Sequence, residues 1–329
     1  MNPGTGVYPS SMAGPDDARA FFSALSERIE ARLFGVGEPL GLVLIGILTD
    51  SHVLIDDVPG VGKTTLVRML ASLLGLRFSR VQFTPDLMPS DITGTSVLNL
   101  KTQEFEFRPG PIFTEILLAD ELNRATPKTQ AALLEAMQER QVTVDGVTYP
   151  LPDPFFVLAT QNPVELEGTF PLPEAQLDRF LLRVRMGYPS KDQEERILTV
   201  SRESRTIPKT PLPDVPNLVE MRTLVEGIRI EQPVRRYIVD LARATRAHAD
   251  LQVGASPRSV EHMGDAVRAR ALLSGRDYVL PDDVKVLAES VLCHRLVLTT
   301  DARIRDRSVQ EILSQIVEVI PVPVEFQGA

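Results

Sequence analysis

The sequence predicts an α/β protein in which a parallel five-stranded sheet is followed by an all-helical domain. Short apolar runs alternate with stretches of helical periodicity, a pattern typical of a doubly wound parallel sheet. After residue 216 the apolar positions recur at helical spacing instead. The expected strands are 52–56, 76–82, 115–119, 155–159 and 181–186, and the expected later helices lie near 217–227, 233–249, 257–274 and 281–294.

Changes in composition divide the chain into four parts. Residues 1–16 are rich in Pro, Gly and Ser, and we expect a mobile tail there. Residues 17–205 form the expected α/β core. Residues 206–216 contain four prolines and are expected to be a linker. Residues 217–329 form the expected helical domain, which ends in a Pro-rich segment that cannot continue a helix.

Helices in the core are expected near 17–33 and 39–48, and again after the first strand. The helix after the first strand places four leucines on one face, which suits packing on a sheet: Leu66, Leu70, Leu73 and Leu74. A helix over 127–138 is expected to be capped by Thr126, and Ser190 with Gln193 has the spacing of a capping box.

Two insertions interrupt the core. Residues 84–111 are too long for a plain crossover and carry the alternating Phe105 and Phe107, a strand-like pattern. Residues 141–149 predict a hairpin that turns at Asp145-Gly146.

Composition narrows the class of protein. The longest apolar stretch, 40–48, is too short to span a bilayer, and the N-terminus lacks the pattern of a signal peptide. Cys293 is the single cysteine, so no intrachain disulfide can form and a cytoplasmic location is expected. The four histidines show no metal-ligand spacing. A net charge of −9 argues against general nucleic-acid binding.

Residues 57–64 have the pattern of a phosphate-binding loop, although Asp57 stands where the usual motif begins with glycine. Gly60 and Gly62 allow the backbone N–H groups to turn inward, and the next helix adds its positive end. Lys63 is expected to reach the β- and γ-phosphates of ATP, and Thr64 to ligate Mg²⁺. The expected nucleotide contacts are Asp57, Val58, Pro59, Gly60, Val61, Gly62, Lys63, Thr64, Thr65 and Asp120.

Polar residues follow two further expected strands. Asp120 and Glu121 end the third apolar run, and Asn162 comes shortly after the fourth. The carboxyl ends of parallel strands are where ligands bind in open α/β sheets. We expect Asp120 to hold Mg²⁺ together with Thr64, and Glu121 to act as the general base toward the attacking water. Asn162 is the expected hydrogen-bond partner of that water.

Together these residues resemble the MoxR family of AAA+ ATPases, in the clade with an insert in the second helix of the core. The resemblance is carried by residues 57–64, 118–125, 159–163, 168–180 and 254–259. It implies an AAA+ P-loop core with a helical lid, and it makes the two insertions the helix-2 insert and the pre-sensor-1 hairpin. In such proteins the helix-2 insert points toward the pore of a ring. The pre-sensor-1 hairpin can move with the nucleotide state and push on a client, or it can simply pack between subunits, and the sequence leaves both alternatives open.

The resemblance also implies roles for arginines. Arg179 resembles the arginine finger that reaches the γ-phosphate bound by a neighbouring subunit, and Arg258 resembles sensor 2, which contacts the γ-phosphate from the lid. Asn162 corresponds to sensor 1. Arg124 either acts at the subunit boundary or forms a surface ion pair. An arginine on transferring phosphoryl charge raises the rate by orders of magnitude.

The implied function is Mg²⁺-dependent ATP hydrolysis in a homo-oligomeric ring, expected to be a hexamer, that remodels or matures a client protein. MoxR relatives often act beside a protein with a von Willebrand factor A domain, so such a partner is expected. The alternatives are a nucleic-acid motor or loader, a magnesium-chelatase-like motor subunit, and a nucleotide switch with little turnover. The net charge weighs against the first alternative, and Glu121 with Arg179 against the last.

Overall fold

A computed structural model describes residues 14–56, 58, 60–162, 168–199, 207–208, 210–213 and 215–323. Most of the expected tail, together with Asp57 and Pro59 of the loop, lies outside the described residues. The same holds for residues 163–167, 200–206 and 324–329.

The core is a five-stranded sheet in the order β2-β5-β8-β1-β9, and every neighbouring pair is parallel. The five predicted strands are confirmed, each within two residues of its expected bounds: β1 (His52–Asp56), β2 (Phe78–Gln82), β5 (Ile116–Asp120), β8 (Phe156–Gln161) and β9 (Phe180–Val184). All five strands therefore begin at one edge of the sheet, the starting edge, and finish at the opposite one, the finishing edge.

Alternate residues of the strands enter two separate hydrophobic cores, as the two-residue period of a strand requires. Val53, Leu118 and Leu158 face α2 (Gly37–Leu48) and α3 (Lys63–Leu74), together with the C-terminal helices. Leu54 and Leu117 face α5 (Pro127–Glu139) on the other side. The leucine face predicted for α3 is buried in the first of these cores.

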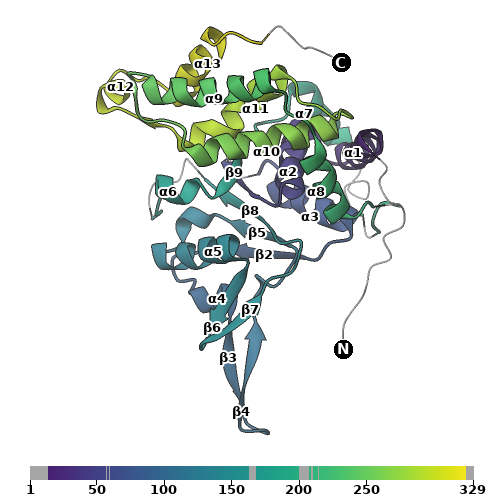
Figure 1. Cartoon of the computed structure of the whole chain (residues 1–329). Coiled ribbons are helices and arrows are strands. Elements are labelled where there is room, and N and C mark those ends of the chain that lie inside the picture. The colour runs from purple at the N-terminus through teal and green to yellow at the C-terminus, as the bar shows by residue number, and fades with distance from the viewer. Residues whose placement is uncertain are drawn as a thin grey trace.

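Both insertions are hairpins. The first contains α4 (Pro89–Thr93), β3 (Gly94–Asn99) and β4 (Glu104–Pro109), and it projects far from the body of the molecule (Figure 1). The second consists of β6 (Gln141–Val144) and β7 (Val147–Pro150) and turns at Asp145-Gly146 as predicted, with φ of 51° and 78°. Phe107 of the first hairpin stacks on Tyr149 of the second at 4.0 Å between ring centroids, so the two hairpins support each other.

Helices α9, α10 and α11 form a layer above the sheet (Figure 1). The four helices predicted for the C-terminal part are confirmed as α8 (Leu218–Gly227), α9 (Gln232–Ala247), α10 (Pro257–Leu273) and α11 (Pro281–Leu292). The sequence analysis did not foresee α12 (Thr300–Ile304), α13 (Val309–Val319) or the antiparallel pair β10 (Leu251–Val253) and β11 (Val297–Leu298). These two strands are too short to show a period in the sequence.

Before the first strand, α1 (Pro15–Glu30) and α2 correspond to the two helices predicted near 17–33 and 39–48. Later in the chain, α6 (Glu174–Leu177) precedes β9 and α7 (Lys191–Thr199) follows it. The capping box of Ser190 and Gln193 is present. Thr126 stands at the N-cap of α5, but its side chain does not cap the helix; its Oγ1 lies 3.2 Å from Thr129 Oγ1 instead. The Thr129 hydroxyl thus takes the place of the backbone N–H group that a capping side chain would bind.

The described residues of the expected linker pack against the core. Leu212 donates its backbone N–H to Leu73 O at 2.9 Å, and both Leu212 and Val215 are buried. This segment therefore lies along α3. Among the described residues, no helix is long and apolar enough to cross a membrane.

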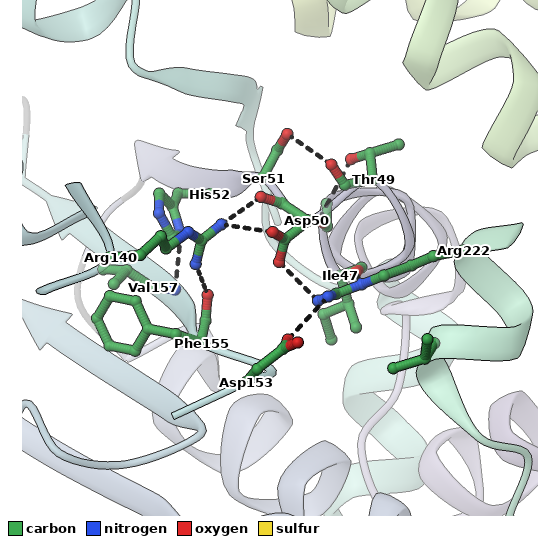
Figure 2. A network of polar contacts seen from close by, with 12 residues as sticks. Ile47, Thr49, Asp50, Ser51, His52, Arg140, Asp153, Phe155, Val157 and Arg222 are labelled. Carbon is green, nitrogen blue, oxygen red and sulfur yellow. Dashed lines mark hydrogen bonds and ion pairs between the residues drawn. The ribbon is translucent and has the colours of Figure 1, made fainter. Parts of the chain in front are cut away.

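A polar network joins the starting edge of the sheet to α8 (Figure 2). The Asp50 carboxylate pairs with Arg140 at 3.2 Å and with Arg222 of α8 at 2.7 Å. Arg222 also pairs with Asp153 at 3.1 Å, and Arg140 donates to Phe155 O at the base of the second hairpin. The network thus fixes α8 and that hairpin to the same corner of the core.

His52 lies within this corner as a neutral side chain. Burial lowers the pKa of His52 to about 3, with Arg140 as a second cause. Its Nδ1 accepts from Val157 N–H at 3.1 Å, and its Nε2 lies 3.2 Å from Met137 O, to which it donates. A neutral ring is the form that can accept at one nitrogen and donate at the other.

Candidate nucleotide-binding site

The phosphate-loop segment joins the end of β1 to the start of α3. Gly60 has φ of +89° and Gly62, the N-cap of α3, has φ of +92°, so both take the left-handed conformation that glycine adopts without strain. A Cβ at Gly62 would lie 2.8 Å from Leu33 Cδ1. Lys63 begins α3, and its Nζ donates to Val58 O at 3.1 Å. The geometry is that of a glycine loop before a helix N-terminus, which attracts phosphate groups.

A cavity of about 440 Å³ lies beside this loop. This volume is within the range of small-ligand sites. Its lining comes from the loop, from the segment after α1 and from the segment after β9, and it consists of Arg32, Leu33, Phe34, Gly60, Val61, Gly62, Thr65, Tyr188, Pro189, Glu194 and Ile197. Phe34 and Tyr188 are the aromatic residues of this lining. Sequence reasoning missed them, because segments so far apart in the chain carry no common motif.

Asp120 ends β5 and is buried. Its Oδ1 accepts from Thr160 Oγ1 at 2.7 Å, and its Oδ2 accepts from Arg80 Nε and Nη2 at 3.0 and 2.7 Å. Arg80 was also missed by sequence reasoning, since it reaches Asp120 through the pairing of β2 with β5. Asp120 is therefore an oriented carboxylate with a cation already beside it.

Glu121 has φ of +57° and turns its side chain toward two donors. Gln82 Nε2 donates to Glu121 Oε2 at 2.8 Å, and Arg124 Nη1 donates to the same oxygen at 2.9 Å. Its backbone N–H is held by Thr160 Oγ1 at 2.8 Å. Both side-chain donors therefore engage one oxygen of the Glu121 carboxylate.

Asn162 follows β8 and is buried at the finishing edge. Gln161 pairs with Asp56 in the sheet, so Asn162 follows the end of β8 at the edge where β1 also ends. Asn123 Nδ2 lies 3.4 Å from Asn162 O and donates to it. Because β1, β5 and β8 are neighbours and parallel, the structure brings Lys63, Asp120, Glu121 and Asn162 to one edge, as predicted.

Arg179 and Arg258 lie elsewhere. Arg179 directly precedes β9, whose first residue, Phe180, pairs with His52 at the beginning of β1. Arg258, in the first turn of α10, has Nη1 3.9 Å from Asp178 Oδ2. Both arginines therefore belong to the starting edge of the sheet, whereas the phosphate loop leaves the finishing edge.

The donor set fits a magnesium ion that arrives with a nucleotide. Within the ranges that the structure describes, no group of three or more His, Cys, Asp or Glu side chains could hold a metal by itself. Mg²⁺ usually takes one or two protein oxygens and completes its shell with phosphate and water. Asp120 and the Thr64 hydroxyl can supply such oxygens.

Comparison with known proteins gives matches over most of the chain. Residues 52–182 match the model of the "ATPase family associated with various cellular activities (AAA)", and residues 243–316 match that of the AAA lid domain. YeaC, an uncharacterized protein of Bacillus subtilis, is 47% identical over 315 residues, which are 95% of this chain and 98% of that protein. Chaperone MoxR1 of Mycobacterium tuberculosis is 42% identical over 291 residues, which are 85% of this chain and 77% of that protein.

A solved structure agrees with the fold. The crystal structure of a protein from Cytophaga hutchinsonii, assigned as an ATPase, matches with a TM-score of 0.84 and 37% identity over 94% of this chain and 97% of that one. The sheet order, the glycine loop and the lid match define the protein as an AAA+ ATPase. Within that class, the chain belongs to the MoxR family.

We predict that Gly62→Ala weakens ATP binding at least about tenfold, because the new Cβ strains a left-handed residue and also collides with Leu33. Gly146→Ala is the matched control: Gly146 has φ of +78° with no atom within 4 Å of an added Cβ, and it lies in the second hairpin. Titration with a fluorescent ATP analogue measures both affinities. Equal affinity of the two variants would contradict the placement of the phosphate site.

Proposed function

We propose that the protein hydrolyses ATP with Mg²⁺ in a ring of identical subunits, each of which completes its neighbour's active site, and that the ring remodels a client protein. Residues 17–205 form the nucleotide-binding core in this proposal, and residues 217–329 the lid. The observation that carries it is the separation of the candidate catalytic groups between two opposite edges of one parallel sheet.

One half of the proposed site lies within a single subunit. Lys63 and the backbone of the glycine loop hold the phosphates, and Thr64 and Asp120 hold the metal. When bound, Mg²⁺ neutralises developing charge on the phosphates. Glu121 takes the proton of the attacking water once it has left Gln82 and Arg124, and Asn162 orients that water.

The other half cannot come from the same subunit. Strands β1 and β9 run in parallel, and Phe180 pairs with His52 while Val184 pairs with Ile55. A strand of this length spans roughly 16 Å at about 3.3 Å per residue, which is more than one arginine side chain covers. Arg179 therefore cannot reach its own phosphate loop, and we propose that it serves the loop of a neighbouring copy.

Arg258 follows the same logic. Its guanidinium lies beside Asp178, the residue before Arg179, and this contact supports a role for Arg258 next to Arg179 and away from its own loop. We therefore propose that Arg179 and Arg258 reach the same neighbouring γ-phosphate. A closed ring satisfies every site with one repeated contact, and a hexamer is the ring we propose.

We predict that Arg179→Ala retains ATP binding and lowers kcat by at least about 100-fold, because an arginine finger contributes that much or more. Lys63→Ala removes binding at its own loop. Mixing the two variants in equal amounts should restore roughly a quarter of the wild-type rate, since a quarter of random neighbours pair an intact loop with an intact finger. Absence of any recovery across mixing ratios would exclude the shared site.

The tip of the first hairpin supports a chaperone role. Leu98 and Phe105 face each other across β3 and β4, and both are exposed, as is Leu100 in the turn. Exposed apolar clusters on soluble proteins mark interaction sites. One relative is named a chaperone, and we propose that this tip contacts the client. A protein with a von Willebrand factor A domain is the proposed partner.

We predict that ATP-loaded Glu121→Gln captures the client and partner from native extract, because it binds ATP without turning it over. Adding Phe105→Ser should reduce the captured client severalfold. Val286→Ser is the matched control, since Val286 is exposed to 48% but lies on α11, away from the hairpins. Mass spectrometry quantifies the captured proteins. Recovery of nuclease-sensitive complexes with DNA would favour a nucleic-acid motor instead.

A further inference from the structure

A buried arginine of the C-terminal part holds the turn that carries Arg179. This turn lies between α6 and β9, and Figure 1 shows α6 beneath one end of α10. Arg295, in the short helix η3 (Cys293–Arg295), is almost completely buried. Its Nε donates to Asp178 Oδ1 at 2.8 Å. A buried guanidinium keeps its charge, so it requires a carboxylate partner, and Asp178 supplies one.

The residue after Arg179 is held from the same side. Arg295 Nη2 donates to Phe180 O at 2.6 Å, and His294 Nε2 lies 3.0 Å from the same oxygen. Arg295 Nη1 donates to Leu181 O at 3.2 Å. Arg179 thus stands between two residues whose polar groups are both bonded to η3. Its backbone position is set by the C-terminal part of the chain as well as by the sheet.

Asp178 also meets the second arginine of the proposed site. One oxygen of its carboxylate accepts from Arg295, and the other lies 3.9 Å from Arg258 Nη1. The Arg258 side chain is 48% exposed, whereas that of Arg295 is 3% exposed. The buried pair is therefore the fixed one, and the contact to Arg258 is long enough to be exchanged for a phosphate.

His262 completes the arrangement on α10. Its Nδ1 accepts from Arg295 Nη2. Burial lowers the pKa of His262 to about 4, with Arg295 as the second cause, so the ring is neutral and can accept. The guanidinium of Arg295 consequently joins η3, α10 and the turn before β9 at one point.

We propose that Asp178 and Arg295 are positioning residues that hold Arg179 and Arg258 as one unit directed at the nucleotide of the neighbouring subunit. This inference rests on the proposed function. Neither residue touches nucleotide; Asp178 fixes the spacing of the two arginines, and Arg295 fixes Asp178 and Phe180 to the lid. The alternative is an ion pair that only stabilises the packing of the lid on the core.

The test is Asp178→Asn, which preserves shape and an acceptor oxygen but leaves Arg295 without a negative partner. Turnover should fall about tenfold or more, while the affinity of the variant's own loop for ATP stays within about twofold, because that loop leaves the opposite edge of the sheet. Asp277→Asn is the matched control: Asp277 pairs with Arg229 in the same part of the chain, and both side chains are exposed. It should turn over ATP at the wild-type rate.

Mixing two variants distinguishes a role of Asp178 in positioning Arg179 from a role in packing the lid on the core. Equal amounts of Asp178→Asn and Lys63→Ala should recover roughly a quarter of the wild-type rate, as Arg179→Ala does, because the lesion then acts on the neighbour's site. Recovery with Arg179→Ala but not with Asp178→Asn would overturn the positioning role and leave the proposed function intact. Recovery with neither would overturn the shared site itself.

A second variant covers a folding defect. If Asp178→Asn loses ATP binding or unfolds early, Arg295→Lys takes its place in every measurement, because it keeps the buried charge and loses the planar fork that joins Asp178 to Phe180. Unchanged turnover of the folded variant would overturn the proposal. A fall in kcat with an unchanged KM for ATP, rescued by Lys63→Ala, would support it.

Discussion

The parallel pairing of β1 with β9 is the constraint on which the rest of the account depends. Parallel strands share their direction, so everything that follows β1 lies at one edge and everything that precedes β9 lies at the other. The glycine loop follows β1, and Arg179 precedes β9. In our proposal these are the binding half and the arginine half of one hydrolytic site, and a single chain cannot bring the two together. Assembly is then a condition of catalysis.

The C-terminal helices are joined to the starting edge by two arginine centres. At one corner, Arg222 of α8 pairs with Asp50 and Asp153 (Figure 2). At the other, Arg295 of η3 pairs with Asp178, the residue before Arg179. Removing the carboxylate partner of a buried arginine such as Arg295 costs about 3–5 kcal/mol, because it leaves a charge without compensation. The aspartates that pair with Arg222 are 47% and 75% exposed, so solvent screens that centre and its contribution is smaller.

At the finishing edge, the carboxylates of Asp120 and Glu121 are held by neighbouring side chains. Gln82 and Arg124 both donate to Glu121, and Arg80 stands against Asp120. These donors compensate the negative charges of two acidic residues that are adjacent in the chain. In the proposed mechanism, Glu121 acts as the general base only after it has left Gln82 and Arg124.

The sequence was most informative where the residues of a strand or of the candidate site are neighbours in the chain. The strands were predictable because buried parallel strands are apolar runs, and Lys63, Asp120 and Asn162 each follow such a run. Arg80, Phe34 and Tyr188 were not predictable, because they reach the site through pairing or packing of distant segments. Arg295 was missed for the same reason. The cap predicted from Thr126 failed because its hydroxyl lies by Thr129, a choice that local spacing does not determine.

The most direct test of the central claim is a structure of the ATP-bound assembly formed by Glu121→Gln. The measurement is the distance from the Arg179 guanidinium to Lys63 Nζ, taken within one subunit and across each boundary between subunits. The account predicts that the shorter distance crosses the boundary at every occupied site, with Arg258 on the same side. A shorter distance within one subunit would contradict it.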